Sequence, residues 1–274
     1  FIPQNISGVI PIPGDGEHYS QMNADKTQII KYSFKTGKPV EVLFDAATAR
    51  ECPFKKFDSY SFSPDGSKLL IATETTPIYR RSYTAVHYIY SLKRNLDGKI
   101  NNVVEKLSDG GPQQIPVFSP DGYQVAFVRD NNIFLVKLLY GNSESQVTED
   151  GKRNEVLNGI PDWVYEEEFN CRDGFRWSPD GQYIAYWQSD TQGTGWFDII
   201  NNVDSIYPKI QRFPYPKAGT ANSAVKVGYV SADGGNTTWL ALPGDARNHY
   251  IPRMEFIPGC NELFIQQMNL SLIH

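Results

Sequence analysis

The chain has 274 residues, of which 40% are hydrophobic, 13% aromatic and 21% charged, and its formal net charge is −5 at pH 7. This composition is typical of a folded globular protein and excludes a disordered chain. The acidic balance and the scattered lysines and arginines argue against nucleic-acid binding. No apolar run is long enough to cross a membrane, and Phe1–Gln4 does not resemble a signal peptide, so we expect any targeting segment to be removed or to lie upstream.

The first predicted elements are two strands near the N-terminus. Gln28–Phe34 and Val40–Phe44 are rich in β-branched and aromatic residues, and Lys35-Thr36-Gly37 separates them. Such runs favour strands, and a glycine between them favours a tight turn. This segment predicts a β-hairpin that belongs to a first structural unit.

A short motif then recurs three times. Ser-Pro-Asp-Gly occurs at residues 63–66, 119–122 and 178–181, so that the copies are 56 and 59 residues apart. Proline sets the backbone for a turn, aspartate hydrogen-bonds locally and glycine accepts a positive φ angle, so each copy predicts a chain reversal between two strands. Repeats of about this length are typical of β-propeller blades, each with four antiparallel strands.

Further strands follow each predicted turn. The apolar runs Leu69–Ala72, Val125–Val128 and Ile184–Trp187 come directly after the three copies and predict the inner strands of blades. His87–Leu92 and Ile133–Leu138 alternate in polarity and predict the strands that come next.

A degraded copy of the motif lies near the C-terminus. Met254–Gly259 followed by Leu263–Ile265 has the same pattern, and we attribute its longer interval to a Pro-rich insertion around Ile206–Ala221. The sequence therefore predicts an all-β protein with about four blades plus part of a fifth. Because Ser271–His274 reads as part of a strand, we expect these blades to belong to a larger ring. A complete four-bladed propeller is the alternative.

No cofactor or metal site is predicted. The cysteines and histidines are too far apart in the sequence to match known metal-binding spacings. They are Cys52, Cys171, Cys260, His18, His87, His249 and His274.

The segment Asp162–Phe169 carries the most specific chemistry. Its three adjacent carboxylates, Glu166 to Glu168, follow three large apolar side chains. Like charges this close repel each other, so a cationic partner is expected, although short acidic runs also occur as solvated faces. Asp162 is predicted to cap a helical turn, with Trp163 and Tyr165 burying its underside.

Three segments, in this order, resemble the dipeptidyl peptidase IV family. They are Tyr79–Ala85, Asp162–Phe169 and Pro214–Gly219, and the likeness extends from about Tyr60 to Tyr250. The resemblance implies that residues 1–274 form the N-terminal part of an eight-bladed β-propeller domain. It also implies a C-terminal α/β-hydrolase domain that is absent from this chain.

The resemblance also implies a substrate-binding site. Glu167 and Glu168 would grip the free amino terminus of a peptide, and Arg80 would hold a substrate carbonyl group. If the loop is shifted by one residue, Arg81 takes the place of Arg80. Glu166 is left with a solvent-exposed or structural role. A peptide ammonium has three hydrogen-bond donors, which two diverging carboxylates can accept.

No G-x-S-x-G nucleophile motif occurs in the sequence, so no catalytic residue is expected in this chain. The resemblance implies a serine exopeptidase that releases Xaa-Pro or Xaa-Ala dipeptides, with this propeller gating the substrate. The implied partners are peptides with a free N-terminus, the hydrolase domain and a second copy in a homodimer. The implied location is periplasmic, extracellular or in the cell envelope. Two alternatives remain open, namely a non-catalytic relative that acts as a peptide- or protein-binding scaffold and an enzyme that releases tripeptides.

Overall fold

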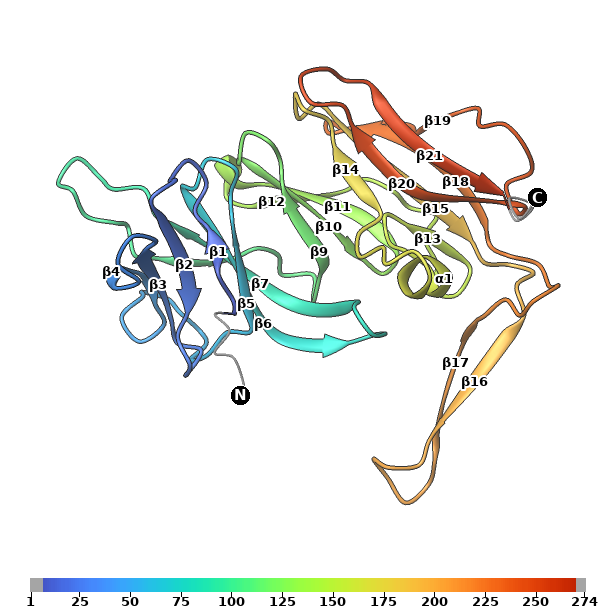
Figure 1. Cartoon of the computed structure of the whole chain (residues 1–274), viewed down its shortest axis with the longest axis horizontal. Helices are drawn as coiled ribbons and strands as arrows, with labels where there is room; N and C mark the ends of the chain where they lie inside the picture. The colour runs from blue at the N-terminus through green and yellow to red at the C-terminus, as the bar shows by residue number, and fades with distance from the viewer. Residues whose placement is uncertain (1–6, 270–274) are drawn as a thin grey trace.

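The computed structural model describes residues 7–269 and consists of antiparallel β-sheets (Figure 1). The helices in this range are the five-residue α1 (Trp163–Glu167) and the three-residue 3-10 turn η1 (Leu138–Tyr140). No helix in residues 7–269 has the length and apolar composition needed to span a membrane. The predicted end of the last strand, Ser271–His274, and the N-terminal Phe1–Gln4 lie outside the described residues.

The strands form consecutive sheets, which we call blades 1 to 5. Blade 1 contains β1 (Ile10–Pro11), β2 (His18–Met22), β3 (Gln28–Ser33) and β4 (Pro39–Asp45). Blade 2 contains β5 (Ser59–Phe62), β6 (Lys68–Pro77), β7 (Tyr83–Ser91) and β8 (Val104–Lys106). Blade 3 contains β9 (Gln114–Phe118), β10 (Gln124–Arg129), β11 (Asn132–Lys137) and β12 (Ser143–Gln146).

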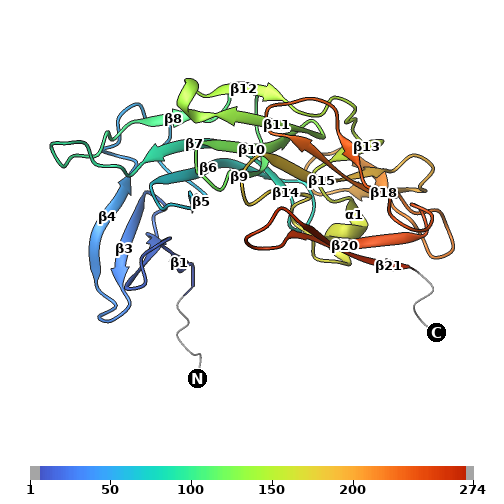
Figure 2. The same ribbon diagram turned by 90° about the horizontal axis from the view of Figure 1, so that it is seen from above.

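Blades 4 and 5 complete the described chain. Blade 4 contains β13 (Val156–Asn158), β14 (Phe175–Trp177), β15 (Tyr183–Asp190), β18 (Ala224–Ser231) and β19 (Thr238–Trp239). Blade 5 contains β20 (His249–Phe256) and β21 (Leu263–Asn269). The predicted architecture, four blades of antiparallel strands and the start of a fifth, is confirmed. Figure 2 shows the blades following one another along an arc. The number of blades in a closed ring stays a prediction.

The three Ser-Pro-Asp-Gly turns have the same internal structure. In each, the serine directly follows the first strand of its motif, is fully buried, and donates a hydrogen bond from Oγ to the aspartate two residues later. The Oγ–Oδ1 distances are 2.6 Å for Ser63 and Asp65, 2.5 Å for Ser119 and Asp121, and 2.6 Å for Ser178 and Asp180. Each serine Oγ also accepts the backbone N–H that opens the next strand, from Lys68, Gln124 and Tyr183. The motif therefore closes its own turn.

The hydrophobic core lies between neighbouring blades. On β6, Leu69 and Ile71 pack with residues of blade 1, whereas Leu70 packs with residues of blade 3. Successive side chains of a strand point to opposite faces of its sheet, so each of these strands contributes to two cores. Strand β10 is arranged in the same way, with Val125 facing blade 2 and Ala126 facing blade 4. This burial on both faces explains the continuous apolar runs in the sequence.

The insertion in blade 4 begins earlier than the sequence predicted. Strands β16 (Trp196–Asn201) and β17 (Lys209–Pro214) pair only with each other and form a hairpin between β15 and β18. Figure 1 shows this hairpin projecting away from the sheets. The expected bounds, Ile206–Ala221, were wrong because the proline content marks only the second half of the insertion. The first half has the aromatic and β-branched composition of an ordinary strand.

Candidate functional site

The acidic segment is an excursion from one edge of blade 4. Strands β13 and β14 both pair with β15, and the chain between them leaves the sheet and returns to it. The Gly174 N–H donates to the Gly159 carbonyl oxygen at 3.0 Å, so the excursion begins and ends at one place. A Cβ atom on Gly174 would lie 2.6 Å from the carbonyl carbon of Gly159. This close approach of two backbones requires glycine at position 174.

Helix α1 lies within this excursion, and Asp162 caps its N-terminus as predicted. Asp162 Oδ1 accepts from the Tyr165 N–H at 2.9 Å, and Oδ2 accepts from Ser223 Oγ at 2.7 Å. Burial raises the pKa of the Asp162 carboxyl group, against the effect of these hydrogen bonds. Tyr165 is buried beneath the helix, and its Oη accepts the Ile251 N–H at 2.7 Å. The cap and the buried tyrosine fix the helix to blades 4 and 5.

The segment Pro214–Gly219 packs against the acidic turn. The ring centroid of Tyr215 lies 4.2 Å from that of Trp163, and Phe213 also contacts Trp163. Two of the three segments that resembled family motifs are therefore in contact with each other.

Glu166 is buried, with 1% of its surface exposed, and it binds the loop between β6 and β7. Its Oε1 accepts the backbone N–H groups of Arg81 at 2.6 Å and Ser82 at 2.9 Å. The solvent-exposed role considered for Glu166 is thus wrong, whereas the structural role is supported. Adjacent residues of a helical turn diverge by about 100°, so Glu166 can face inward while Glu167 and Glu168 point in other directions.

Glu167 forms an ion pair with Arg80. Arg80 Nε lies 2.9 Å from Glu167 Oε2, and the side chains are 73% and 15% exposed, respectively. The neighbouring Arg81 turns the other way, since its Nη1 donates to the Glu166 carbonyl oxygen at 3.2 Å. The structure therefore places the side chain of Arg80, and not that of Arg81, beside the Glu167 carboxylate.

Glu168 closes helix α1 and is exposed. Its side chain forms no hydrogen bond or ion pair with any other residue in the range 7–269. Tyr250 lies near it, and burial together with the charges of Asp162 and Glu168 raises the pKa of the Tyr250 hydroxyl group. Of the two predicted gripping acids, one is paired with arginine and the other has no such partner within the described range.

The contacts of Glu166 hold the loop more strongly than the Arg80–Glu167 ion pair. An exposed ion pair contributes about 0.2–1 kcal/mol to stability. A hydrogen bond to a charged group contributes about 1.5–3 kcal/mol, and Glu166 accepts two of them in a buried setting. Glu166 therefore provides the stronger attachment between helix α1 and the loop that carries Arg80.

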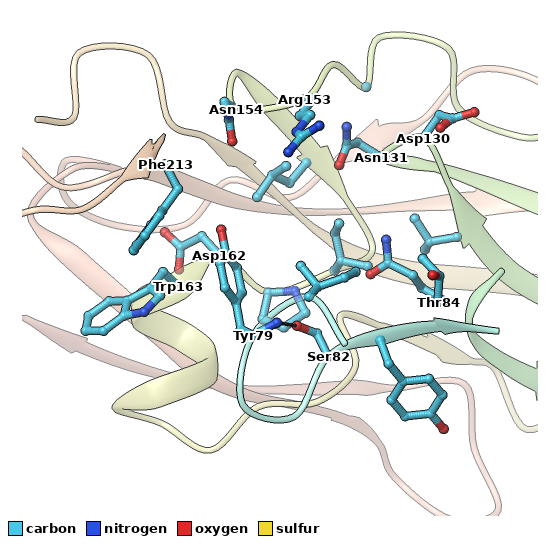
Figure 3. A pocket seen from close by; sticks show the side chains of 18 of the residues that line it. Tyr79, Ser82, Thr84, Asp130, Asn131, Arg153, Asn154, Asp162, Trp163 and Phe213 are labelled. Atoms are coloured by element: carbon cyan, nitrogen blue, oxygen red, sulfur yellow. Dashed lines mark hydrogen bonds between the residues drawn. The ribbon is translucent and has the colours of Figure 1, made fainter. Parts of the chain in front are cut away.

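A cavity of about 800 Å³ lies beside this loop (Figure 3). Tyr79, Arg81 and Ser82 line it together with Arg153 and Phe213, but Arg80, Glu167 and Glu168 do not. Burial, with a smaller contribution from the negative charges of Asp162 and Glu166, raises the pKa of Tyr79 to about 12. No sequence pattern predicted this cavity, because its walls come from blades 2, 3 and 4.

Antiparallel blades carrying a short acidic helix that faces an arginine loop define a β-propeller-type domain. Residues 63–270 match the family described as the Dipeptidyl peptidase IV (DPP IV) N-terminal region. The chain belongs to this family, and the resemblance identified from its three segments is confirmed.

Known relatives agree with this assignment. The chain is 32% identical to human prolyl endopeptidase FAP over 245 residues, covering 89% of this chain and 29% of the relative. It is 38% identical to dipeptidyl peptidase 4 of Felis catus over 180 residues, covering 64% and 22% of the two chains. The crystal structure of Porphyromonas gingivalis dipeptidyl peptidase 4 superposes with a TM-score of 0.87 at 41% identity, covering 96% of this chain and 36% of that chain. This chain thus spans about a third of such relatives or less.

Proposed function

We propose that this chain is the part of a serine exopeptidase that recognises the N-terminus of a peptide and gates its access, so that Xaa-Pro or Xaa-Ala dipeptides are released. The observation that carries the proposal is the contact between Arg80 and Glu167 next to the exposed carboxylate of Glu168. This arrangement offers negative charge and an arginine within a few ångströms of each other.

The first residue of a peptide matches these groups. Its α-amino group has a pKa near 7.7–8.0 and is largely a cation near neutral pH, with three donors for carboxylate acceptors. Its carbonyl oxygen lies about 3 Å from that nitrogen and needs a donor on the same side. Glu168 and Glu167 can accept from the ammonium, while the guanidinium of Arg80 has N–H groups beyond the one bound to Glu167.

Binding the amine at a fixed place determines which peptide bond reaches a distant nucleophile. Under this proposal Glu167 and Glu168 act as a molecular ruler, and the nucleophile belongs to the hydrolase domain that such enzymes carry. An interior segment of a polypeptide has no ammonium group and would be rejected.

A homodimer is a further part of the proposal. The hairpin β16–β17 exposes apolar side chains at its sides and tip, which would be buried by a second copy. They include Ile199, Ile200, Val203, Ile206, Tyr207 and Ile210.

The test uses the full-length protein that contains this chain and a Gly-Pro chromogenic substrate. We expect cleavage of the substrate with a free amine and at least a hundredfold lower kcat/KM for the N-acetylated form, since acetylation removes the cation. Equal cleavage of both forms would refute recognition of the amine. Release of tripeptides from longer substrates would mean that the bound amine lies one residue further from the nucleophile than proposed.

A non-catalytic peptide-binding protein is the second candidate. It is favoured by the 30% identity, over 206 residues, to a rat relative named inactive dipeptidyl peptidase 10. Labelling of the full-length protein by a serine-directed fluorophosphonate separates the two candidates, because only the peptidase would be labelled.

A further inference from the structure

We propose that Glu166 is a positioning residue that sets which arginine of the β6–β7 loop faces the peptide and at what distance from the acidic pair. The functional consequence rests on the proposed function, whereas the structural clamp can be tested without it. The family resemblance left Glu166 with a solvent-exposed or structural role and did not connect it with the β6–β7 loop.

The clamp joins two parts of the chain that are 84 and 85 residues apart. Glu166 Oε1 accepts two successive backbone N–H groups, from Arg81 at 2.6 Å and Ser82 at 2.9 Å. In the opposite direction, Arg81 Nη1 donates to the Glu166 carbonyl oxygen at 3.2 Å. Because both the backbone and the guanidinium of Arg81 are bound to one residue, the loop cannot rotate or slip without breaking these contacts together.

Besides these contacts, the loop is held by two hydrogen bonds of its own and by packing of the Tyr79 ring on Phe213 of the blade 4 hairpin, with ring centroids 5.5 Å apart. It is closed by the Ile78 N–H, which donates to the Ser82 carbonyl oxygen at 2.8 Å, and by Tyr79 N–H bonding to Ser82 Oγ at 3.2 Å. Both bonds lie within the loop and do not attach it to blade 4. The attachments to helix α1 are the Glu166 contacts and the exposed Arg80–Glu167 ion pair.

The second carboxylate oxygen of Glu166 supports this role. Oε2 is buried and has no hydrogen-bond partner in the described part of the chain. A buried carboxylate with one unsatisfied oxygen is costly, and such a group calls for an explanation beyond packing. The charge-assisted hydrogen bonds to the loop explain why a carboxylate is buried here, because such bonds are about twice as strong as bonds to a neutral acceptor.

The contacts of the three acids then give each of them a separate task. Glu166 faces inward and fixes the loop, Glu167 pairs with the arginine that the loop presents, and Glu168 is available to bind a cation. If the clamp is released, the loop can shift so that Arg81 competes with Arg80. The separation between the donor for the carbonyl and the acceptors for the ammonium would then no longer be fixed.

The test compares Glu166→Asp with Glu166→Gln in the full-length protein, using backbone hydrogen exchange of the Arg81 and Ser82 amides. Aspartate keeps the charge but is shorter by about 1.5 Å, so it cannot reach the loop. We expect exchange at both amides to rise about ten- to a hundredfold. Glutamine keeps the length and a carbonyl acceptor but loses the charge, so exchange should rise by less than it does in Glu166→Asp.

Glu167→Asp is the matched control. It shortens the neighbouring acid by the same amount, and the Arg81 and Ser82 amides should remain protected, while amides of β10 serve as an internal reference. Unchanged exchange in Glu166→Asp, or equal increases in both aspartate variants, would overturn the clamp. These outcomes do not depend on whether the protein is a peptidase.

Steady-state kinetics with the Gly-Pro substrate test the positioning role. We expect Glu166→Asp to lower kcat/KM about tenfold and Glu166→Gln to lower it by no more than about threefold. If exchange rises in Glu166→Asp but kcat/KM is unchanged, the loop position does not matter for the reaction and the positioning role is wrong. If the wild type releases no dipeptide, the proposed function fails, and with it the positioning role, whereas the exchange data still decide the clamp.

Discussion

Arg80 Nε lies 2.9 Å from Glu167 Oε2, although these residues are 87 positions apart in the chain. The contact joins a loop of blade 2 to a helix inserted in blade 4. A pair that is 73% exposed on the arginine side contributes little to stability. The contact instead brings a guanidinium group and a carboxylate together at one point on the surface.

Replacing either predicted gripping acid should impair the reaction. In the full-length protein, Glu167→Gln or Glu168→Gln should each lower kcat/KM for a Gly-Pro substrate by about ten- to a hundredfold, because each removes a charged hydrogen bond to the ammonium. Steady-state kinetics measure the effect. Glu149→Gln changes an exposed acid away from this site and is the matched control. Comparable losses in all three variants would contradict the assignment.

The isolated chain should be inactive. No G-x-S-x-G motif is present, so the purified 274-residue polypeptide should not hydrolyse a Gly-Pro substrate, while the full-length protein should. The isolated chain should also self-associate, since Val40 and Val42 of blade 1 and Phe264 of blade 5 are exposed. Size-exclusion chromatography with light scattering checks the second point. Turnover by the isolated chain that a serine-directed inhibitor blocks would disprove the first.

Gly174 should tolerate no side chain. Gly174→Ala places a Cβ 2.6 Å from the Gly159 backbone, and the required shift should cost about 1–3 kcal/mol of unfolding free energy. Urea denaturation of the full-length protein measures this loss. Gly16→Ala is the matched control, because a Cβ at that position would have no other atom within 4 Å and the φ of Gly16 is not positive. A Gly174→Ala variant as stable as Gly16→Ala would show that the excursion can open at no cost.

His87 should make the stability of the fold depend on pH. Burial lowers its pKa to about 4, although its hydrogen bonds to Gln113 and the backbone act in the opposite direction. The ordinary value is near 6.5, so the unfolded chain binds the proton more tightly than the folded protein does. The stabilisation from neutral His87 is therefore present above about pH 6.5 and is lost as the pH falls towards 4.

The size of this effect is at most about 3 kcal/mol, since one pKa unit corresponds to 1.36 kcal/mol. Denaturation of wild type and His87→Gln at pH 7 and pH 4 checks it. The free energy of unfolding should fall less in the variant than in the wild type between these two values. Equal decreases would mean that His87 is not the titrating group.

The sequence alone determined the elements whose contacts are local. The Ser-Pro-Asp-Gly turns could be predicted because their hydrogen bonds span two to five residues. The cap at Asp162 could be predicted for the same reason, since its partner is Tyr165. Successive side chains of β6 point to opposite faces of the sheet and enter two cores, so its continuous apolar run was enough to indicate an inner strand.

The tertiary structure alone decided the arrangement of the site. The family resemblance assigned the gripping role to Glu167 and Glu168 and the carbonyl contact to Arg80, but no local rule gives a physical reason to separate Glu166 from Glu167 or Arg80 from Arg81. The positions of these side chains depend on how blades 2, 3 and 4 pack against one another. This packing brings the loop and the helix within hydrogen-bond distance. Burial then converts Glu166 into an acceptor for the Arg81 and Ser82 backbone, because a buried carboxylate needs donors that only the distant loop supplies.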